Sequence, residues 1–258
     1  MKLAHRAARR LILPALLAGL AIPRATAARG ATEVLDKGSI VVSLNGRSIG
    51  REDFQFTHAG DSLVVSSTST FTMPTPDGER KSKKLLGVVF GHGDMMLRSY
   101  TSNEEFDDHV RVRGVVINSE TALTLLNELD KRGHGDTYER PPGRLFVLES
   151  QLYSLMYVLA YAVRDQSFDR RPVNIIALAQ RDTIQEAELV RQPVETIRWG
   201  NRPVQTDHLQ FVQGPVTIDL WMDRLGRVLR IAHAPSGLLV EREAQKVRPP
   251  AKPRKSGG

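Results

Sequence analysis

Strand-like runs separated by tight-turn signals recur along most of this chain, and this alternation constrains its fold more than any other feature. The run 38–44 is followed by Asn45-Gly46, the strongest short signal for a two-residue β-hairpin. The next run, 47–58, alternates so that Phe54 and Phe56 share one face. This pattern predicts an antiparallel meander at the start of the fold.

The same alternation continues through both halves of the sequence. Pro74-Thr75-Pro76-Asp77-Gly78 and Ala234-Pro235-Ser236-Gly237 are further turn signals of the kind that join strands. We expect the other strands at about 63–73, 80–90, 94–101, 109–117, 172–180, 184–191, 194–199, 203–212, 215–222, 226–233 and 237–243, with a short apolar run at 145–148.

Two helices are predicted between the two sets of strands. Ser119 can cap the first helix, and Leu123, Leu126 and Leu129 follow at helical spacing before Gly133. The second is expected to start near Ser150, with an apolar stripe beside a stripe of three tyrosines: Tyr153, Tyr157 and Tyr161. The predicted fold class is therefore α+β, mainly antiparallel β, with a large curved sheet or half-barrel and a helical insert at about 119–164.

The first 27 residues are typical of a secretory signal peptide. Four positive charges precede an apolar stretch at 11–22, and Ala25-Thr26-Ala27 fits a cleavage site. A short membrane anchor is the alternative, but a spanning helix needs about 20 apolar residues. We therefore expect export to the periplasm and a single β-rich domain at 28–245.

The positive net charge of +7 lies at the two ends of the chain. The segments 1–27 and 246–258 carry five positive charges each and no negative ones, which leaves −3 for residues 28–245. A body with that charge is not expected to bind nucleic acid. The proline-rich basic segment 246–258 is predicted to be a disordered tail, which either makes weak contact with an anionic surface or aids solubility.

No motif predicts a catalytic residue, a metal site or a cofactor. The chain has no cysteine, which excludes thiol catalysis and cysteine-bound metals, and it contains no G-x-S-x-G, H-E-x-x-H or phosphate-binding loop. Asp107 and His109 would share a strand face and could hold a metal with a third ligand, although a solvated loop explains them better. The protein is therefore not expected to be an enzyme, with a hydrolase as the remaining alternative.

A run of basic residues, Arg80-Lys81-Ser82-Lys83-Lys84, lies on one predicted strand. Alternation places positive charges on both faces of that strand. This is typical of an exposed edge strand that is protected against aggregation.

A family resemblance rests on four features of the sequence. They are the predicted signal peptide, the phrase SLNGRSIGREDF at 43–54, the two predicted central helices and the phrase WMDRLGRVLRIAHAPSGLLVERE at 221–243. The chain resembles uncharacterised bacterial exported proteins, domains of unknown function allied to the LolA/LolB lipoprotein-carrier fold, over most of 35–243. The resemblance implies an incomplete antiparallel barrel with helices closing its open side around an apolar cavity. It also implies a lipid or acyl chain as ligand, and no catalytic residues.

Aromatic and apolar residues between the predicted sheet and helices are the candidates for lining such a pocket, because ligand cavities are mostly apolar. They are Phe54, Phe56, Tyr153, Tyr157, Leu220 and Trp221. The predicted function is a periplasmic protein that binds an apolar ligand in a half-barrel cavity. The alternative is a protein–protein interaction module in cell-envelope assembly, and ordinary core packing would explain the same six residues.

Overall fold

The computed structural model describes residues 32–75, 78–179 and 182–244. The predicted signal peptide 1–27 and tail 246–258 therefore lie outside the described residues. The elements in chain order are β1 (Thr32–Leu44), β2 (Arg47–Ala59), β3 (Ser62–Thr75), β4 (Gly78–Gly91), β5 (Leu97–Phe106), β6 (His109–Ile117), β7 (Ala122–Leu129), β8 (Arg132–Glu139), β9 (Leu145–Glu149), α1 (Ser154–Val163), β10 (Arg170–Leu178), β11 (Thr183–Trp199), β12 (Arg202–Gln213), β13 (Val216–Met222), β14 (Val228–His233), the short 3-10 helix η1 (Ala234–Ser236) and β15 (Leu238–Arg242).

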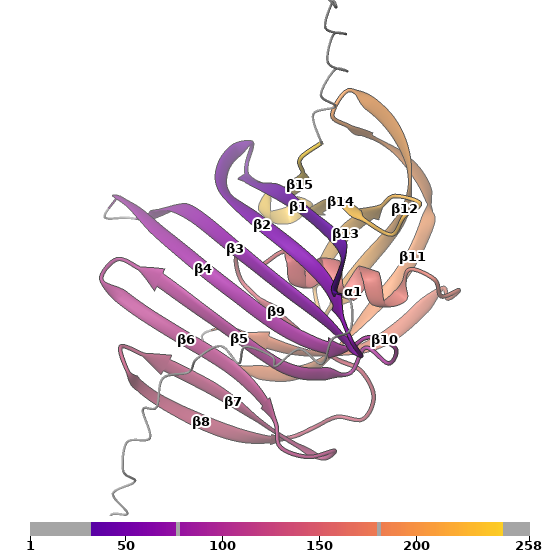
Figure 1. The fold of residues 1–258 in the computed structure, drawn as a ribbon. Helices are drawn as coiled ribbons and strands as arrows, with labels where there is room; N and C mark the ends of the chain where they lie inside the picture. The colour runs from indigo at the N-terminus through magenta and orange to yellow at the C-terminus, as the bar shows by residue number, and fades with distance from the viewer. Residues whose placement is uncertain (1–31, 76–77, 180–181, 245–258) are drawn as a thin grey trace, which may run out of the picture.

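All fifteen described strands belong to one open sheet, in the order β8-β7-β6-β5-β4-β3-β2-β1-β15-β14-β13-β12-β11-β10-β9. Neighbours are antiparallel except β9 and β10, which run parallel. Figure 1 shows the sheet curving around α1. The prediction of a mainly antiparallel β fold with one large sheet is confirmed. The two strands predicted at 184–191 and 194–199 are a single strand, β11, whose register shifts between Gln192 and Glu195.

The first and last described strands join the two halves of the sheet. Residues 40–44 of β1 pair with residues 238–242 of β15. The guanidinium group of Arg242 donates two hydrogen bonds to the carboxylate of Asp36, at 2.8 and 2.6 Å, and lies over the ring of Phe54. Because Arg242 is buried, this bidentate ion pair fixes the seam between β1 and β15 from inside the sheet.

The helix predicted at about 119–132 is wrong, because that segment forms the hairpin of β7 and β8. Asp130 and Lys131 both adopt positive φ, at 51° and 66°, which is the geometry of a two-residue type I′ turn. The leucines allow two periods: 123, 126 and 129 repeat as in a helix, whereas Leu123 and Leu125 alternate as in a strand. Pairing with the edge of β6 decides for the strand.

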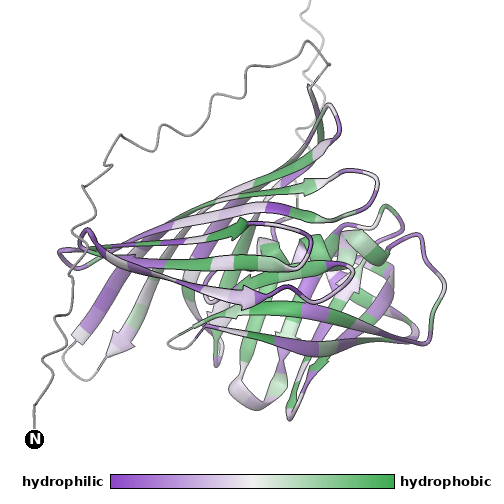
Figure 2. Cartoon of the chain, turned by 90° about the horizontal axis from the view of Figure 1, so that it is seen from below, coloured by the Kyte–Doolittle hydropathy of each residue, from purple (hydrophilic) through white to green (hydrophobic). Residues whose placement is uncertain are grey.

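One α-helix, α1, is present among the described residues, and nine of its ten residues are buried. It packs against the inner face of the sheet, and apolar residues gather around it in Figure 2. Ten residues of helix, even fully apolar, are too few to cross a bilayer, and no described helix meets the length and hydropathy of a membrane span. The presence of α1 confirms the second predicted helix, which begins at Ser154 rather than near Ser150.

The basic run at 80–84 is not on an edge strand, contrary to the sequence-based prediction. Strand β4 lies between β3 and β5 in the sheet. Lys81 and Lys83 are exposed on the outer face, whereas Lys84 is buried on the inner face. The charge on Lys84 can be buried there because the neighbouring strand β5 places Glu104 directly opposite it.

Candidate functional site

Three of the six predicted pocket residues pack together at the contact between β2 and α1. Phe54 and Phe56 are buried on the inner face of β2, and Tyr157 comes from the middle of α1. The ring of Tyr157 lies edge-on to that of Phe54, with 5.1 Å between their centroids. Phe56 makes a similar contact with Tyr161 at 6.0 Å. These aromatic rings fill the space between strand and helix where the sequence predicted a cavity.

The other three predicted residues are dispersed. Tyr153 immediately precedes α1, with its ring 6.2 Å from that of Phe71. Leu220 is fully buried, but Trp221 follows it on β13 and therefore points to the opposite face. Trp221 donates a hydrogen bond to Glu195 there, at 2.8 Å. The structure therefore does not bring the six residues into one pocket, and their role in ligand binding stays a prediction.

Glu52 on β2 caps the start of α1. Its carboxylate accepts hydrogen bonds from the backbone N–H of Tyr153 at 2.7 Å, and from the N–H of Ser154 at 3.2 Å and its hydroxyl. A carboxylate at a helix N-terminus satisfies donors that have no partner within the helix. Glu52 is fully buried, and this burial raises its pKa even though its hydrogen bonds favour the charged form.

The raised pKa of Glu52 predicts a pH-dependent stability. The folded protein holds the Glu52 proton to higher pH than the unfolded chain does, so stability is full below the usual carboxyl range and falls as pH rises through the folded pKa. We expect Glu52→Gln to remove this fall, because glutamine keeps an acceptor oxygen and cannot ionise. Urea unfolding of both proteins from pH 4 to 8 would measure it, with Asp53→Asn on the exposed face as the control. Parallel curves for the natural and Glu52→Gln proteins would contradict the prediction.

A second buried carboxylate, Glu149, fastens the end of β9 to the inner face of β4 and β5. It accepts hydrogen bonds from Lys84 at 2.9 Å, from Ser102 at 2.7 Å and from the hydroxyl of Tyr100. Burial opposes the charge on Glu149, but the positive charge of Lys84 and these hydrogen bonds outweigh it, so its pKa is lowered. Arg113 lies 3.7 Å away and donates to the carbonyl oxygen of Ala179. The cluster thus holds β9 against β4, β5 and β6.

His109, which the sequence offers as a metal ligand with Asp107, and His233 both take part in hydrogen bonds to a neighbouring side chain. His109 pairs with Asp130 at 2.7 Å, and the described residues contain no group of three or more side chains placed to bind a metal ion. His233 lies 2.7 Å from the hydroxyl of Ser236, but among the described residues no carboxylate hydrogen-bonds to that imidazole. The Ser–His–acid arrangement that a hydrolase needs is therefore not formed by this pair.

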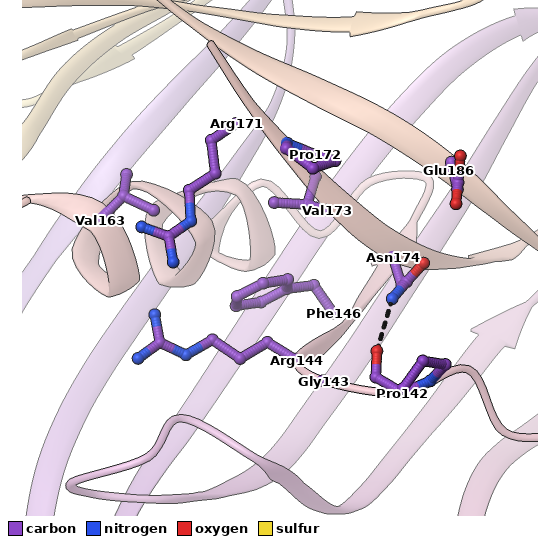
Figure 3. A pocket seen from close by; sticks show the side chains of 10 residues that line it. All are labelled: Pro142, Gly143, Arg144, Phe146, Val163, Arg171, Pro172, Val173, Asn174 and Glu186. Carbon is purple, nitrogen blue, oxygen red and sulfur yellow. Dashed lines mark hydrogen bonds between the residues drawn. The ribbon is translucent and has the colours of Figure 1, made fainter. Parts of the chain in front are cut away.

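A hollow of about 470 Å³ lies beside the C-terminal end of α1, between β9 and β10 (Figure 3). Phe146, Val163 and Val173 supply its apolar surface. Arg144 and Arg171 lie on the α1 side of the Phe146 ring, and Glu186 lies on the other side. A second hollow, at Leu129, Asp130 and Arg132, lies on the β7–β8 turn and has few lining residues.

The parallel pairing of β9 with β10 brings the residues of the first hollow together. Asn174 of β10 lies opposite Leu145 of β9, and its side chain donates to the carbonyl oxygen of Pro142 at 3.0 Å. Sequence reasoning nominated none of the residues that line this hollow. The sequence signal nearest to the hollow is Pro141-Pro142-Gly143, a turn that indicates a break between two segments.

Comparisons with known proteins place the chain in no family. No family model and no curated protein matches it, so no match supports the resemblance to the LolA/LolB carriers. One solved structure is similar, the crystal structure of a DUF1089 family protein from Pseudomonas aeruginosa, with 10% identity and a TM-score of 0.43. The similarity covers 69% of this chain and 87% of that one. A likeness at this level identifies neither a fold family nor a function for the chain.

Proposed function

We propose that the protein binds a small amphipathic ligand, such as an acyl chain, in the hollow between β9, β10 and the end of α1. The observation that carries this proposal is the lining of the hollow, which combines apolar side chains with two guanidinium groups. About 470 Å³ falls within the range of about 300–1,000 Å³ that is usual for small-molecule sites. Its apolar surface consists of the edges of Phe146, Val163 and Val173, which the core holds in place.

The proposal moves the ligand from the interior of the sheet to this hollow. Phe54, Phe56 and Tyr157 pack against one another, so an apolar chain would have to displace α1 to reach them. Such a displacement would break the Glu52 cap and expose nine buried helix residues. The hollow needs no such rearrangement, since it lies outside the contact between α1 and β2.

A matched pair of tryptophan variants tests this proposal. Glu186 lines the hollow, whereas Gln185, the exposed residue before it on β11, does not. We expect the natural protein to bind decanol in isothermal titration calorimetry, and Glu186→Trp to weaken that binding about tenfold. That factor corresponds to the loss of roughly two buried methylene groups, at ~0.8 kcal/mol each.

Gln185→Trp is the control and should leave the affinity for decanol unchanged. Neither substitution disturbs a buried side chain, because positions 185 and 186 are both exposed. Absence of decanol binding to the natural protein, or equal affinities in the two tryptophan variants, would exclude the hollow as the site.

A further inference from the structure

The positive charges of Arg144 and Arg171 have no carboxylate partner within salt-bridge distance among the described residues. Arg170, the neighbour of Arg171 on β10, provides the contrast. It turns to the other face of the strand and donates two hydrogen bonds to Glu188. The two arginines of the hollow are thus unlike the paired arginine beside them.

Arg144 is held in a fixed position by backbone groups. Its Nε donates to the carbonyl oxygen of Asp94 at 2.8 Å, and one terminal nitrogen donates to that of Ala162 at 3.3 Å. Because a guanidinium group has five N–H donors, these two bonds orient the group without using its donors up. The side chain of Arg171 makes no hydrogen bond to any other described residue, so its donors are also available within the hollow.

The charges around the hollow favour an anion. Glu186 is the one carboxylate among its described lining residues, and it lies across the hollow from the two guanidinium groups (Figure 3). The two arginines lie next to the apolar surface of Phe146 and Val163. This arrangement suits a molecule whose charged end meets the arginines and whose chain covers the apolar residues.

We infer that the ligand of this hollow carries one anionic headgroup, a carboxylate or a phosphate, that Arg144 and Arg171 bind together. The inference rests on the proposed function, because it assigns the headgroup of the ligand that the hollow would hold. A guanidinium group can donate two hydrogen bonds to two oxygens of one anion, and both a carboxylate and a phosphate offer such a pair of oxygens. Contact with the apolar surface should make such an amphiphile bind more tightly than a free anion.

Five probes separate the headgroup from the chain: decanoate, decyl phosphate, decanol, acetate and inorganic phosphate. We expect calorimetry at neutral pH to show decanoate or decyl phosphate binding about tenfold or more tightly than decanol, as one hydrogen-bonded ion pair would provide. Equal affinities for decanoate, decyl phosphate and decanol would overturn the headgroup inference and leave the proposed apolar site intact. Inorganic phosphate binding as tightly as decyl phosphate would support the arginine site and overturn the proposed acyl ligand.

Arginine variants locate the headgroup. Arg171→Gln should weaken binding of the preferred anionic probe about tenfold and leave decanol unaffected, since glutamine removes the charge and keeps most of the side chain. Arg170→Gln is the matched control, and it should change neither affinity. Equal effects of the two variants would mean a general electrostatic attraction and would overturn the inference. Arg144→Lys should give an intermediate loss, because lysine keeps the charge without the planar donor pair.

Discussion

Replacing Glu149 with alanine is expected to lower the free energy of unfolding by about 3–5 kcal/mol. The substitution removes the carboxylate that neutralises the buried positive charges of Lys84 and Arg113. The Lys84 side chain is only 3% exposed, so water cannot replace the lost partner. Urea unfolding at neutral pH, followed by circular dichroism, would measure the loss.

Two further variants serve as controls for Glu149→Ala. Glu105→Ala removes an exposed carboxylate from β5 and should change stability by about 0.5 kcal/mol or less. The double variant Lys84→Met with Glu149→Leu removes the buried Lys84–Glu149 ion pair, leaves Glu104 paired with Arg111, and should recover part of the loss. A Glu149→Ala protein as stable as Glu105→Ala would show that the cluster does not hold β9 in place.

Phe56→Ala is expected to cost about 3–5 kcal/mol of stability without changing the affinity for decanol. Phe56 is 2% exposed and contacts the rings of Phe54 and Tyr161, so its removal leaves a cavity between β2 and α1. It does not line the hollow at the end of α1. The same unfolding and calorimetric measurements would separate the two effects.

The control for Phe56→Ala is Gln55→Ala, at the exposed position before it on β2. That variant should retain the stability of the natural protein within about 0.5 kcal/mol. A Phe56→Ala protein that stays stable but no longer binds decanol would contradict our assignment. It would return the ligand to the pocket that the sequence predicts between sheet and helix.

Local signals in the sequence predicted the strands well because the hairpin turns are themselves local. Asn45 and Gly46 both adopt positive φ, as the type I′ turn requires. The strand after the turn follows its predicted bounds closely, whereas β1 begins six residues before the predicted start at 38. The inward positions of Phe54 and Phe56 follow from simple alternation. These features depend on residues within about a dozen positions of one another.

The errors come from contacts between segments far apart in sequence. Leu123 to Leu129 became a strand because β6 offers an edge to pair with, which a single-segment pattern does not show. Lys84 was predicted on an exposed edge because its partner Glu149 lies 65 positions away. Glu52 caps a helix from 102 positions away, so no capping motif exists near Ser154.

The candidate site escaped prediction for the same reason. Arg144 and Arg171 lie on the same side of the hollow because β9 and β10 run parallel, with α1 forming the connection between them. A parallel pair has no hairpin turn to reveal it. The nominated aromatic residues were correctly placed near α1, but residue type alone does not distinguish a lined cavity from a packed core.

The seam between β1 and β15 has a consequence for the order in which the protein folds. Asp36 and Arg242, which pair across it, are separated by 206 positions. Until the last strand is available, β1 and β14 each present an unpaired edge, and the two halves of the sheet cannot join. Contacts of such long sequence separation slow folding and prolong the exposure of strand edges that can pair with other chains. We therefore expect the edges of β1 and β14 to be open to pairing with other chains until β15 adds to the sheet.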